Sequence, residues 1–473
     1  MQDRFVKPQP GAHIHLMGIC GTAMASLAGI LKAKGFKISG TDQNVYPPMS
    51  TMLQDLGIEI KEGYKAEYLE PRPDLVIVGN VIQKKFDQAQ ALLDSDIPFT
   101  SLPRAMSEFV IEDRHSVVAA GTHGKTTTTS MMATMAEQAG LAPGFLIGGI
   151  PENFSHSFRA PESDYFIIEG DEYDTAFFDK VPKFVHYKPK SVILTSIEFD
   201  HADIYDSLEP IMAAFKRLVE LIPADGTLVA HADDENIKKL LPFAKCKVVT
   251  YGLSSGDYQV ADRDVQVGRN QFVVCKNGKR EMDIAIKFFG PHNTLNALAC
   301  YALADSLGWK KRDIAQGLAN FKGVRRRQQI LGQPGGVTVI EDFAHHPTAV
   351  KLTLQGLKEA YPGQKVIAIF EPRSATSRRK VFQKDYAEAF RSADHSIIAP
   401  AFNQDSIAEN DRFSVDQLIA DLKSSGASAE TVKAVDDIPG LVAGEAHKGD
   451  VVIVMSNGGF GGIYQPLMEK LNR

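Results

Sequence analysis

Residues 119–129 read AAGTHGKTTTT and carry the residue types of a phosphate-binding loop. Backbone amides at a helix N-terminus attract phosphate oxygens, a lysine such as Lys125 reaches the outer phosphates of a nucleotide, and the hydroxyl of Thr126 is a ligand for Mg²⁺. A strand-like run, SVVAAG, leads into the loop and a helical pattern follows it, which is the context that such a loop requires. The sequence therefore predicts a site for ATP and Mg²⁺ formed by Gly121, Thr122, His123, Gly124, Lys125, Thr126 and Thr127.

The loop departs from the general pattern G-x-x-x-x-G-K-[ST] at Ala119, where the first glycine belongs. Alanine fits if residue 119 is part of the strand, because Gly121 and Gly124 remain for the turn itself. The alternative interpretation is a glycine-rich turn that caps a threonine-rich helix. The lysine and the strand–helix context favour the ATP site.

A magnesium ion held by one threonine needs further ligands, and neighbouring strand ends usually supply them. Glu169 closes the apolar run YFIIE, and His201 follows the stretch EFD. Taken alone, each could belong to a solvated acidic loop. Because both follow strand-like runs downstream of the phosphate loop, the sequence predicts a metal site made by Thr126, Glu169 and His201.

Short apolar runs alternate with helical patterns along the chain, which is typical of parallel sheets with crossover helices. We expect an α/β protein of three domains, each an open, mostly parallel sheet with helices. The first and third should be Rossmann-like and the central one a P-loop domain, with bounds of 1–112, 113–323 and 324–473. The pair Asn277-Gly278 predicts a hairpin and an antiparallel edge in the central domain. Ligands should bind at the carboxyl ends of the strands.

The first domain opens with HIHLMGICGT and FKISGTD, which resemble a Rossmann unit with an acidic residue, Asp42, roughly 20 residues after the glycines. The turn reads G-x-x-G and lacks G-x-G-x-x-G, so an NAD-dependent dehydrogenase is only a remote alternative. Residues 13–31 contain no charged side chain and could also be the apolar part of a signal peptide. The glycines within them favour a strand, a turn and a small-residue helix under a sheet.

Composition is that of a globular protein, with 44% apolar and 23% charged residues. A net charge of −6 with mixed signs gives no reason to expect nucleic acid or a membrane as a partner. The sequence gives no indication of an oligomeric state. We expect a cytoplasmic location, because four widely spaced cysteines are typical of reduced thiols: Cys20, Cys246, Cys275 and Cys300.

Six motifs, in this order and at these spacings, resemble the ATP-dependent Mur ligases of bacterial cell-wall synthesis: GTHGKTTTT, EGDEYD, EFDHADIY, GPHNTLNALA, GVRRR and EDFAHHPT. The resemblance covers essentially the whole chain. The histidine in the phosphate loop and the G-x-x-G turn are similar to the branch that acts on UDP-N-acetylmuramic acid. Members of that branch add either L-alanine, in the de novo pathway, or the tripeptide L-alanyl-γ-D-glutamyl-meso-diaminopimelate, in peptidoglycan recycling.

Three stretches resemble the tripeptide-adding ligases: DQNVYPPMST (42–51), EPRSATS (371–377) and MSNGGFGGIYQ (455–465). The resemblance thus implies an ATP-dependent ligase that joins the carboxylate of UDP-N-acetylmuramic acid to the amine of the tripeptide. The reaction would pass through an acyl phosphate and produce ADP and phosphate. Ligation of L-alanine is the alternative within the family.

The resemblance also implies roles for individual residues. The catalytic residues would be Lys125, Glu169, His201 and His123, the last of them near the muramic carboxylate. ATP would further contact Asn293, Asn296, Arg326 and Asp342, although the two asparagines could equally be a helix cap and a surface amide. The UDP-sugar would contact Gly18, Ile19, Gly21, Thr22, Asp42 and Asn80. The peptide would contact Arg373, Ser374, Ser456, Asn457, His345 and His346.

Several Mur ligases use a carbamylated lysine as a metal-bridging ligand shortly after the DH motif. The corresponding stretch here reads EPIMAAFKRLVE, and Phe215 stands at or beside that position. We therefore do not predict a carbamate, and His201 would serve in its place.

Overall fold

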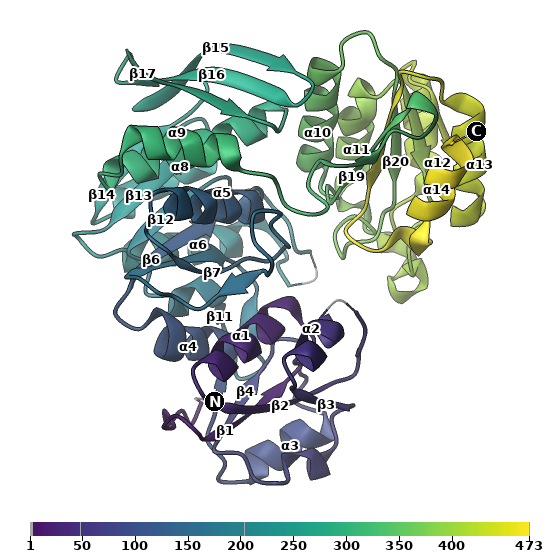
Figure 1. Cartoon of the computed structure of the whole chain (residues 1–473). Coiled ribbons are helices and arrows are strands. Elements are labelled where there is room, and N and C mark those ends of the chain that lie inside the picture. The colour runs from purple at the N-terminus through teal and green to yellow at the C-terminus, as the bar shows by residue number, and fades with distance from the viewer. Residues whose placement is uncertain (1–2, 48, 203, 473) are drawn as a thin grey trace. The chain divides into compact units, whose positions relative to one another are not determined.

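The computed structural model describes residues 3–47, 49–202 and 204–472 (Figure 1). The chain divides into two compact units. The first comprises Met1–Ile197, Glu209–Tyr258 and Ala299–Leu318, and the second comprises Glu198–Leu208, Gln259–Leu298 and Ala319–Arg473. Among the described residues, every helix is too short or too polar to span a membrane.

Five parallel strands form the first sheet, in the order β3-β2-β1-β4-β5. The strands are β1 (His13–Met17), β2 (Lys37–Asp42), β3 (Glu59–Glu62), β4 (Leu75–Val78) and β5 (Phe99–Ser101). The helices are α1 (Thr22–Ala33), α2 (Met49–Asp55), α3 (Asp87–Asp94) and α4 (Leu102–Met106). Residues 13–31 therefore form the strand, the turn and the buried helix that the sequence analysis favoured over the apolar part of a signal peptide.

The second sheet has the order β17-β16-β15-β14-β13-β12-β6-β9-β7-β8. Its strands are β6 (His115–Ala120), β7 (Gly144–Leu146), β8 (Phe158–Arg159), β9 (Tyr165–Gly170), β12 (Ser191–Leu194), β13 (Thr227–His231), β14 (Lys247–Tyr251), β15 (Tyr258–Gln266), β16 (Arg269–Lys276) and β17 (Lys279–Ile286). A separate antiparallel pair consists of β10 (Asp174–Ala176) and β11 (Asp179–Pro182). The helices are α5 (Lys125–Gln138), α6 (Leu208–Leu221), α7 (Glu235–Leu240), α8 (Pro291–Ser306) and α9 (Lys311–Asn320).

The predicted hairpin is the antiparallel pair β16–β17 at one edge of this sheet. Its turn is the predicted pair, with φ of 49° at Asn277 and 75° at Gly278. Positive φ at both central residues is the signature of the turn that matches the twist of paired strands. The antiparallel edge is thus confirmed, together with the sequence feature that produces it.

The third sheet has the order β18-β19-β23-β20-β21-β22, and only β18 runs antiparallel to its neighbour. Its strands are β18 (Gln329–Gly332), β19 (Thr338–Asp342), β20 (Val366–Phe370), β21 (His395–Ile398), β22 (Ala429–Thr431) and β23 (Val451–Met455). The helices are α10 (Pro347–Ala360), α11 (Gln383–Ala389), α12 (Val415–Ser424), α13 (Ile438–Glu445) and α14 (Tyr464–Leu471).

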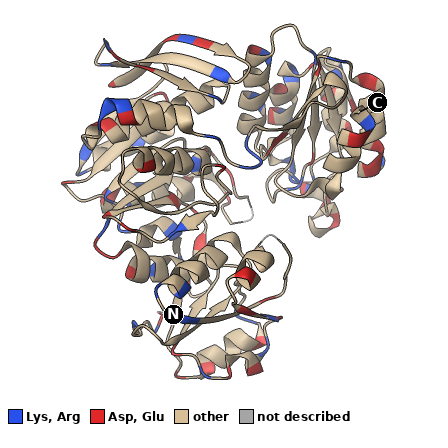
Figure 2. Cartoon of the chain, viewed as in Figure 1, with Lys and Arg blue, Asp and Glu red and all other residues tan. Residues whose placement is uncertain are grey.

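Helices cover both faces of the third sheet, because its central strands are apolar on both sides. Along β20, Val366 and Ala368 belong to a core cluster shared with α10, α11 and α12, whereas Ile367 belongs to one shared with α13 and α14. This near-continuous apolar pattern is what a parallel sheet between two helical layers requires. Positions of Lys and Arg and positions of Asp and Glu are interspersed along the chain, as the coloured ribbon of Figure 2 shows.

Candidate functional site

The phosphate loop joins β6, in the interior of the second sheet, to α5. Ala119 is fully buried and pairs with Ile193 of β12 and Glu169 of β9, so it is a strand residue, as predicted. The turn itself contains Gly121, with a φ of 130°, and Gly124, with a φ of 81°. Gly124 is the N-cap residue of α5. A Cβ at position 121 would lie 2.2 Å from Thr195 Oγ1, so this position requires glycine.

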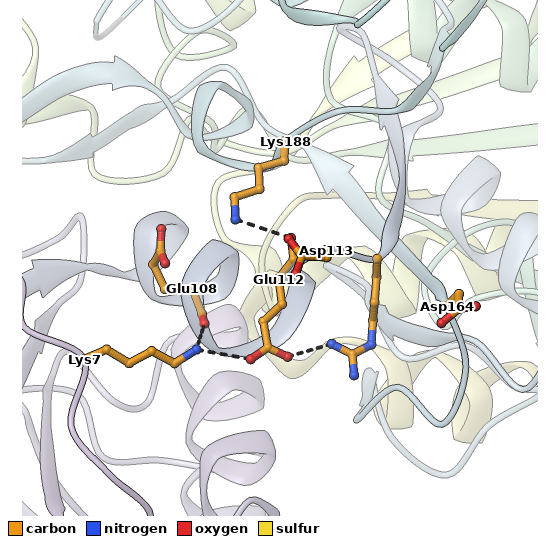
Figure 3. A pocket seen from close by; sticks show the side chains of 7 residues that line it. Lys7, Glu108, Glu112, Asp113, Asp164 and Lys188 are labelled. Carbon is orange, nitrogen blue, oxygen red and sulfur yellow. Dashed lines mark hydrogen bonds and ion pairs between the residues drawn. The ribbon is translucent and has the colours of Figure 1, made fainter. Parts of the chain in front are cut away.

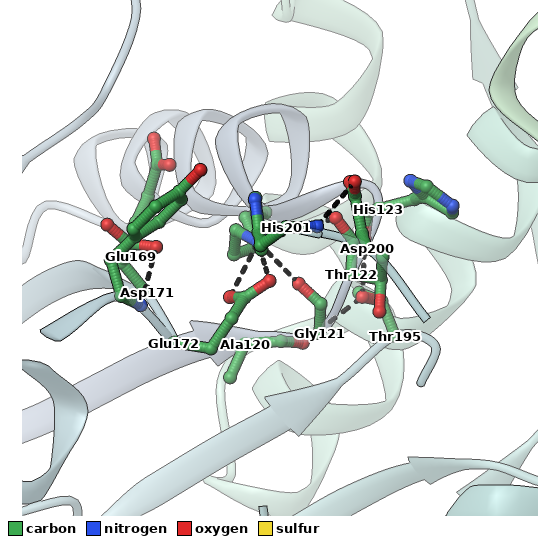
Figure 4. A network of polar contacts seen from close by, with 12 residues as sticks. Ala120, Gly121, Thr122, His123, Glu169, Asp171, Glu172, Thr195, Asp200 and His201 are labelled. Atoms are coloured by element: carbon green, nitrogen blue, oxygen red, sulfur yellow. Dashed lines mark hydrogen bonds and ion pairs between the residues drawn. The ribbon is translucent and has the colours of Figure 1, made fainter. Parts of the chain in front are cut away.

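Hydrogen bonds fasten the loop to the end of β12. The amide of Thr122 donates to Ser196 O (2.8 Å), and the amide of His123 donates to Ser196 Oγ (3.1 Å). Thr195 Oγ1 donates to His123 O (2.5 Å), which Figure 4 shows beside the loop. The backbone at Thr122 and His123 is therefore fixed by the neighbouring strand, and the side chain of His123 remains half-buried.

Lys125, the first residue of α5, is paired with a carboxylate that the sequence did not single out. Its Nζ lies 2.9 Å from Glu172 Oε2 and donates to Gly121 O at 2.7 Å. Burial by itself would lower the pKa of Lys125, but the Glu172 and Asp171 carboxylates outweigh burial and raise it. Lys125 is thus a cation that Glu172 and the carbonyl of Gly121, both labelled in Figure 4, hold against the loop.

Glu169, at the carboxyl end of β9, lies directly beside the loop threonine. Thr126 Oγ1 donates to Glu169 Oε2 at 3.1 Å, and the other carboxylate oxygen accepts from Gly148 N at 2.5 Å. A hydroxyl and a carboxylate at hydrogen-bond distance are the hard oxygen donors that Mg²⁺ prefers. Two of the three predicted metal ligands are therefore together. The third, His201, belongs to the second compact unit.

The predicted UDP-sugar residues gather at the carboxyl edge of the first sheet. The amides of Gly18 and Ile19 donate to Thr41 O, at 2.7 and 3.1 Å, and Gly21 caps α1 just before Thr22. Asn80 is exposed just beyond β4.

Asp42 closes the glycine turn in the first domain. It is buried, and its carboxylate accepts from the amides of Cys20 (2.8 Å) and Asn44 (2.9 Å). The structure therefore gives Asp42 the task of shaping the turn.

In the second unit, Asp342 and Arg326 support backbone. Asp342 is buried and accepts from the amides of Gln328 (2.8 Å) and Ala344 (2.7 Å), and burial raises its pKa. Arg326 donates to Glu341 Oε1 and Ser456 O, both at 2.9 Å. Asp342 and Arg326, which are both predicted ATP contacts, thus hold backbone next to the third sheet in place in this structure.

The side chain of Arg373 lies beside the loop after β23 and is held by contacts with Phe402 and Glu371. Its guanidinium carbon lies 3.7 Å from the centroid of the Phe402 ring, and its Nη1 donates to Glu371 Oε1 at 3.3 Å. The other oxygen of Glu371 accepts from Ser456 Oγ at 2.5 Å. A Cβ at Gly458 would lie 2.0 Å from Arg373 Nε, so the arginine crosses the loop where that residue has no side chain. A planar cation held in this way suits a carboxylate ligand.

Three other predicted peptide contacts have internal partners or are half-buried. Ser374 Oγ donates to Ser377 Oγ at 2.9 Å. Asn457 is half-buried, and its Oδ1 has no hydrogen-bond partner among the residues that the structure describes. His345 Nδ1 lies 3.1 Å from Phe343 O. Asn457 therefore has an acceptor available near Arg373.

His346 joins the third domain to the loop after β12. The ring caps α10 by accepting from Thr348 N at 3.3 Å through Nδ1, so its Nε2 is the nitrogen that donates to Phe199 O at 3.1 Å. Thr348 Oγ1 in turn donates to Glu198 Oε2 at 2.7 Å. His346 is buried, and its contacts position the loop that carries His201.

The two predicted adenine contacts, Asn293 and Asn296, lie buried on α8. Asn293 Nδ2 donates to Phe289 O at 3.0 Å and lies 3.2 Å from His292 Nε2. Neither asparagine is the surface amide that the residues alone allowed.

Comparison with known proteins assigns the chain to a family. Models described as Mur ligase family catalytic domain, Mur ligase middle domain, and Mur ligase, glutamate ligase domain match residues 13–114, 119–304 and 326–458. The chain is 40% identical to the UDP-N-acetylmuramate–L-alanyl-γ-D-glutamyl-meso-2,6-diaminoheptandioate ligase of Escherichia coli K12, over 97% of this chain and 98% of that protein. This chain belongs to the Mur ligase family.

Two further relatives of this Mur ligase frame its place in the family. The UDP-N-acetylmuramate–L-alanine ligase of Clostridium botulinum strain Langeland is 32% identical over 98% of both chains. The crystal structure of a murein peptide ligase from Psychrobacter arcticus matches with a TM-score of 0.71 and 36% identity, over 98% of this chain and 99% of that one. The chain is therefore an ATP-dependent, peptide-bond-forming ligase with the three-domain α/β Mur ligase fold, and the dehydrogenase alternative is wrong.

The stretch EPIMAAFKRLVE, where the resemblance would place a carbamylated lysine, lies in α6. Phe215 is fully buried in α6 and packs against Phe184, with ring centroids 5.7 Å apart. Lys216 points elsewhere, since its ammonium lies 3.9 Å from the Phe243 ring centroid and 3.8 Å from Glu220 Oε1.

A charged pocket elsewhere in this Mur ligase contains none of the predicted site residues. Figure 3 shows that it is lined by Lys7, Glu108, Glu112, Asp113, Arg114, Asp164 and Lys188. The Glu112 carboxylate lies 3.1 Å from Lys7 Nζ, 2.7 Å from Arg114 Nη1 and 3.5 Å from Lys34 Nζ. The Glu112 carboxylate thus lies between cations of three separate segments, so ion pairs link these segments around the pocket.

Proposed function

We propose that this Mur ligase joins the lactyl carboxylate of UDP-N-acetylmuramic acid to the amine of L-alanyl-γ-D-glutamyl-meso-diaminopimelate in peptidoglycan recycling. The observation that carries the proposal is the ATP site on β6 and α5, where Lys125, Thr126 and Glu169 lie together in a chain that is similar along its whole length to a tripeptide ligase. Identity to that ligase is 40%, compared with 32% for the L-alanine ligase.

The reaction requires two displacements. A carboxylate oxygen of the muramic acid attacks the γ-phosphorus of ATP, the bond to the β–γ bridging oxygen breaks, and ADP leaves. The tripeptide amine then attacks the acyl carbon, loses a proton, and expels inorganic phosphate. Neither step needs a covalent bond to the protein, so positioning and charge neutralisation carry the catalysis.

The residues of the loop fit these tasks. Lys125 would exchange Glu172 for the outer phosphates, because both partners are anionic and lie within reach of the same ammonium. Thr126 and Glu169 would hold Mg²⁺, whose charge stabilises the transferring phosphoryl group when it is bound. His201 would serve on the acyl-phosphate side, and His123, half-buried in the loop, would face the muramic carboxylate.

Other parts of the site follow from the same proposal. The glycine turn at Gly18–Thr22 and the exposed Asn80 would hold the UDP-sugar, with its phosphates at the N-terminus of α1. Arg373, Ser374, Asn457 and the neighbouring Ser456 would receive the peptide, with Arg373 opposite a carboxylate. We place the domain boundaries near residues 113 and 324, and the enzyme in the cytoplasm.

A phosphate-release assay tests the proposal directly. ATP, Mg²⁺ and UDP-N-acetylmuramate are combined with either the tripeptide or L-alanine, and kcat/KM is measured for each amine. We expect the tripeptide to give the higher kcat/KM. A higher value for L-alanine would assign the chain to the de novo pathway. If no phosphate is released with either amine, ligation of this nucleotide sugar is contradicted altogether.

A further inference from the structure

The loop after β12 carries a residue in an unfavourable backbone conformation. His201 has φ 58°, in the left-handed region that side chains other than glycine and asparagine seldom adopt. Its carbonyl accepts from the amides of Ile204 (2.9 Å) and Tyr205 (3.0 Å), and its own amide donates to Asp200 Oδ1 (2.7 Å). The direction in which the imidazole leaves the chain therefore depends on how firmly Asp200 is held.

Asp200 is held by Thr376, a residue of the stretch EPRSATS that lies 176 positions later in the chain. Thr376 Oγ1 donates to Asp200 Oδ1 at 2.8 Å and lies 3.3 Å from the amide of Ala202, from which it accepts. Asp200 and Thr376 are 4% and 3% exposed. One buried hydroxyl thus contacts the residue before His201 and the residue after it.

A tight turn presents this hydroxyl. Ser374 Oγ accepts from the amide of Ser377 at 2.9 Å, and the carbonyl of Thr376 accepts from Arg379 N at 3.0 Å. The turn fixes the backbone of Thr376 from both sides. The turn therefore orients the side chain of Thr376 toward the loop that carries His201, and this orientation does not require Thr376 to touch substrate.

We propose that Thr376 is a positioning residue, which holds His201 for ligation by fixing Asp200 and Ala202. The inference rests on the proposed function, in which His201 acts at the acyl phosphate. Thr376 lies in the segment that matches the glutamate ligase domain model, residues 326–458, whereas His201 lies in the middle domain model, residues 119–304. The hydroxyl therefore couples the orientation of His201 to the domain that receives the peptide.

Two substitutions separate the hydroxyl from the shape of the side chain. Thr376→Val keeps the volume but can neither donate to Asp200 nor accept from Ala202, whereas Thr376→Ser keeps both hydrogen bonds. Thr431→Val is a control in the same domain, because it removes the hydroxyl of an exposed threonine that donates to Ile398 O at 2.8 Å. Hydrogen exchange of the peptide covering residues 199–206 reports on the loop in the free protein, and steady-state ligation reports on catalysis.

We expect Thr376→Val to speed exchange in residues 199–206 and to lower kcat by about 10- to 100-fold, with KM for ATP nearly unchanged. Thr376→Ser and Thr431→Val should keep wild-type exchange and kcat. Unchanged exchange in Thr376→Val would overturn the inference, and so would a serine variant as impaired as the valine variant. Absence of ligation by the wild type would instead refute the proposed function, while the exchange data would still decide whether Thr376 holds the loop.

Discussion

Lys125 Nζ lies 2.9 Å from Glu172 Oε2, and these two side chains are only 16% and 2% exposed. The lysine that the proposed reaction requires is therefore neutralised by a buried carboxylate. A phosphate that binds Lys125 must compete with this pair, so Glu172 sets part of the free energy of nucleotide binding.

Glu172→Gln should destabilise the free protein and increase the stabilisation that nucleotide provides. Loss of the carboxylate leaves the buried ammonium bonded to the carbonyls of Gly121 and Thr122 and attracted by the Asp171 and Glu169 carboxylates, and it costs about 1–3 kcal/mol. A bound phosphate restores the missing charge. Thermal denaturation with and without a non-hydrolysable ATP analogue should show a larger rise in Tm for the variant than for the wild type. Glu137→Gln, which removes a half-exposed partner of Arg159 on α5, is the control. Equal rises would show that Glu172 does not compete with nucleotide.

Lys125→Ala should abolish ATP-dependent ligation while UDP-N-acetylmuramate still binds. The substitution removes the cation that would reach the outer phosphates, but the glycine turn of the first domain is untouched. Phosphate release and calorimetric titration of the nucleotide sugar measure the two properties. Lys180→Ala is the control, because Lys180 is 65% exposed and pairs with Asp174 away from the loop. Substantial ligation by Lys125→Ala would contradict the assignment of the ATP site.

Gly121→Ala should disrupt the phosphate loop, whereas Ala119→Gly should not improve it. A methyl group at 121 would lie 2.2 Å from Thr195 Oγ1 and 2.8 Å from Ser196 O, so the loop or the end of β12 must move. Ala119→Gly restores the general loop pattern but removes a buried methyl group from a strand, at a cost of about 1 kcal/mol. KM for ATP and the unfolding midpoint in urea are the measurements. A Gly121→Ala variant with normal KM would refute the steric argument.

Stability should fall in acid partly through Glu112. Burial opposes ionisation of this carboxyl, but Arg114 and Lys7 outweigh it and lower its pKa to about 2 from an ordinary value of 4.5. A depressed pKa means that the contribution is complete above pH 4.5 and is lost as the pH falls toward 2. Since the carboxyl is one-third exposed, we expect about 1 kcal/mol at neutral pH. Glu112→Gln should therefore lower the free energy of unfolding at pH 7 and have little effect near pH 2.5. An equal effect at both values would show that the charge of Glu112 does not contribute.

The sequence predicted the elements that carry strong local patterns. The buried apolar strands and the Asn277-Gly278 turn were placed correctly, because apolar runs and positive-φ turn residues depend on local chemistry. Short or partly polar strands were missed: β3 reads EIKE, and β5 has three residues. The strands β3 and β5 form only because a neighbouring strand of the sheet provides an edge to which they can hydrogen-bond. A local sequence pattern does not contain this information.

Residues of the candidate site could be predicted only where the residue type and its local position together indicate one kind of chemistry. Thr126 opens the helix after the phosphate loop and Glu169 closes a strand, and the structure places their oxygens 3.1 Å apart; the metal that they would hold stays a prediction. Glu172 was missed, because EGDEYD offers several acidic residues and only the fold shows which one faces Lys125. Thr376 gave no signal, since its contact with Asp200 spans 176 positions. Asp342 stays a predicted ATP contact, and its two carboxylate oxygens accept from the amides of Gln328 and Ala344.

The fit between Arg373 and Gly458 makes the two positions interdependent during evolution. Any side chain at 458 would occupy the space of the guanidinium, where a Cβ would stand 2.0 Å from Nε. With any other residue at 458 the arginine side chain would have to move, so a relative that keeps this arginine in this conformation should favour glycine at the second position, and one that loses the arginine is released from the constraint. The two columns of a family alignment should therefore change together.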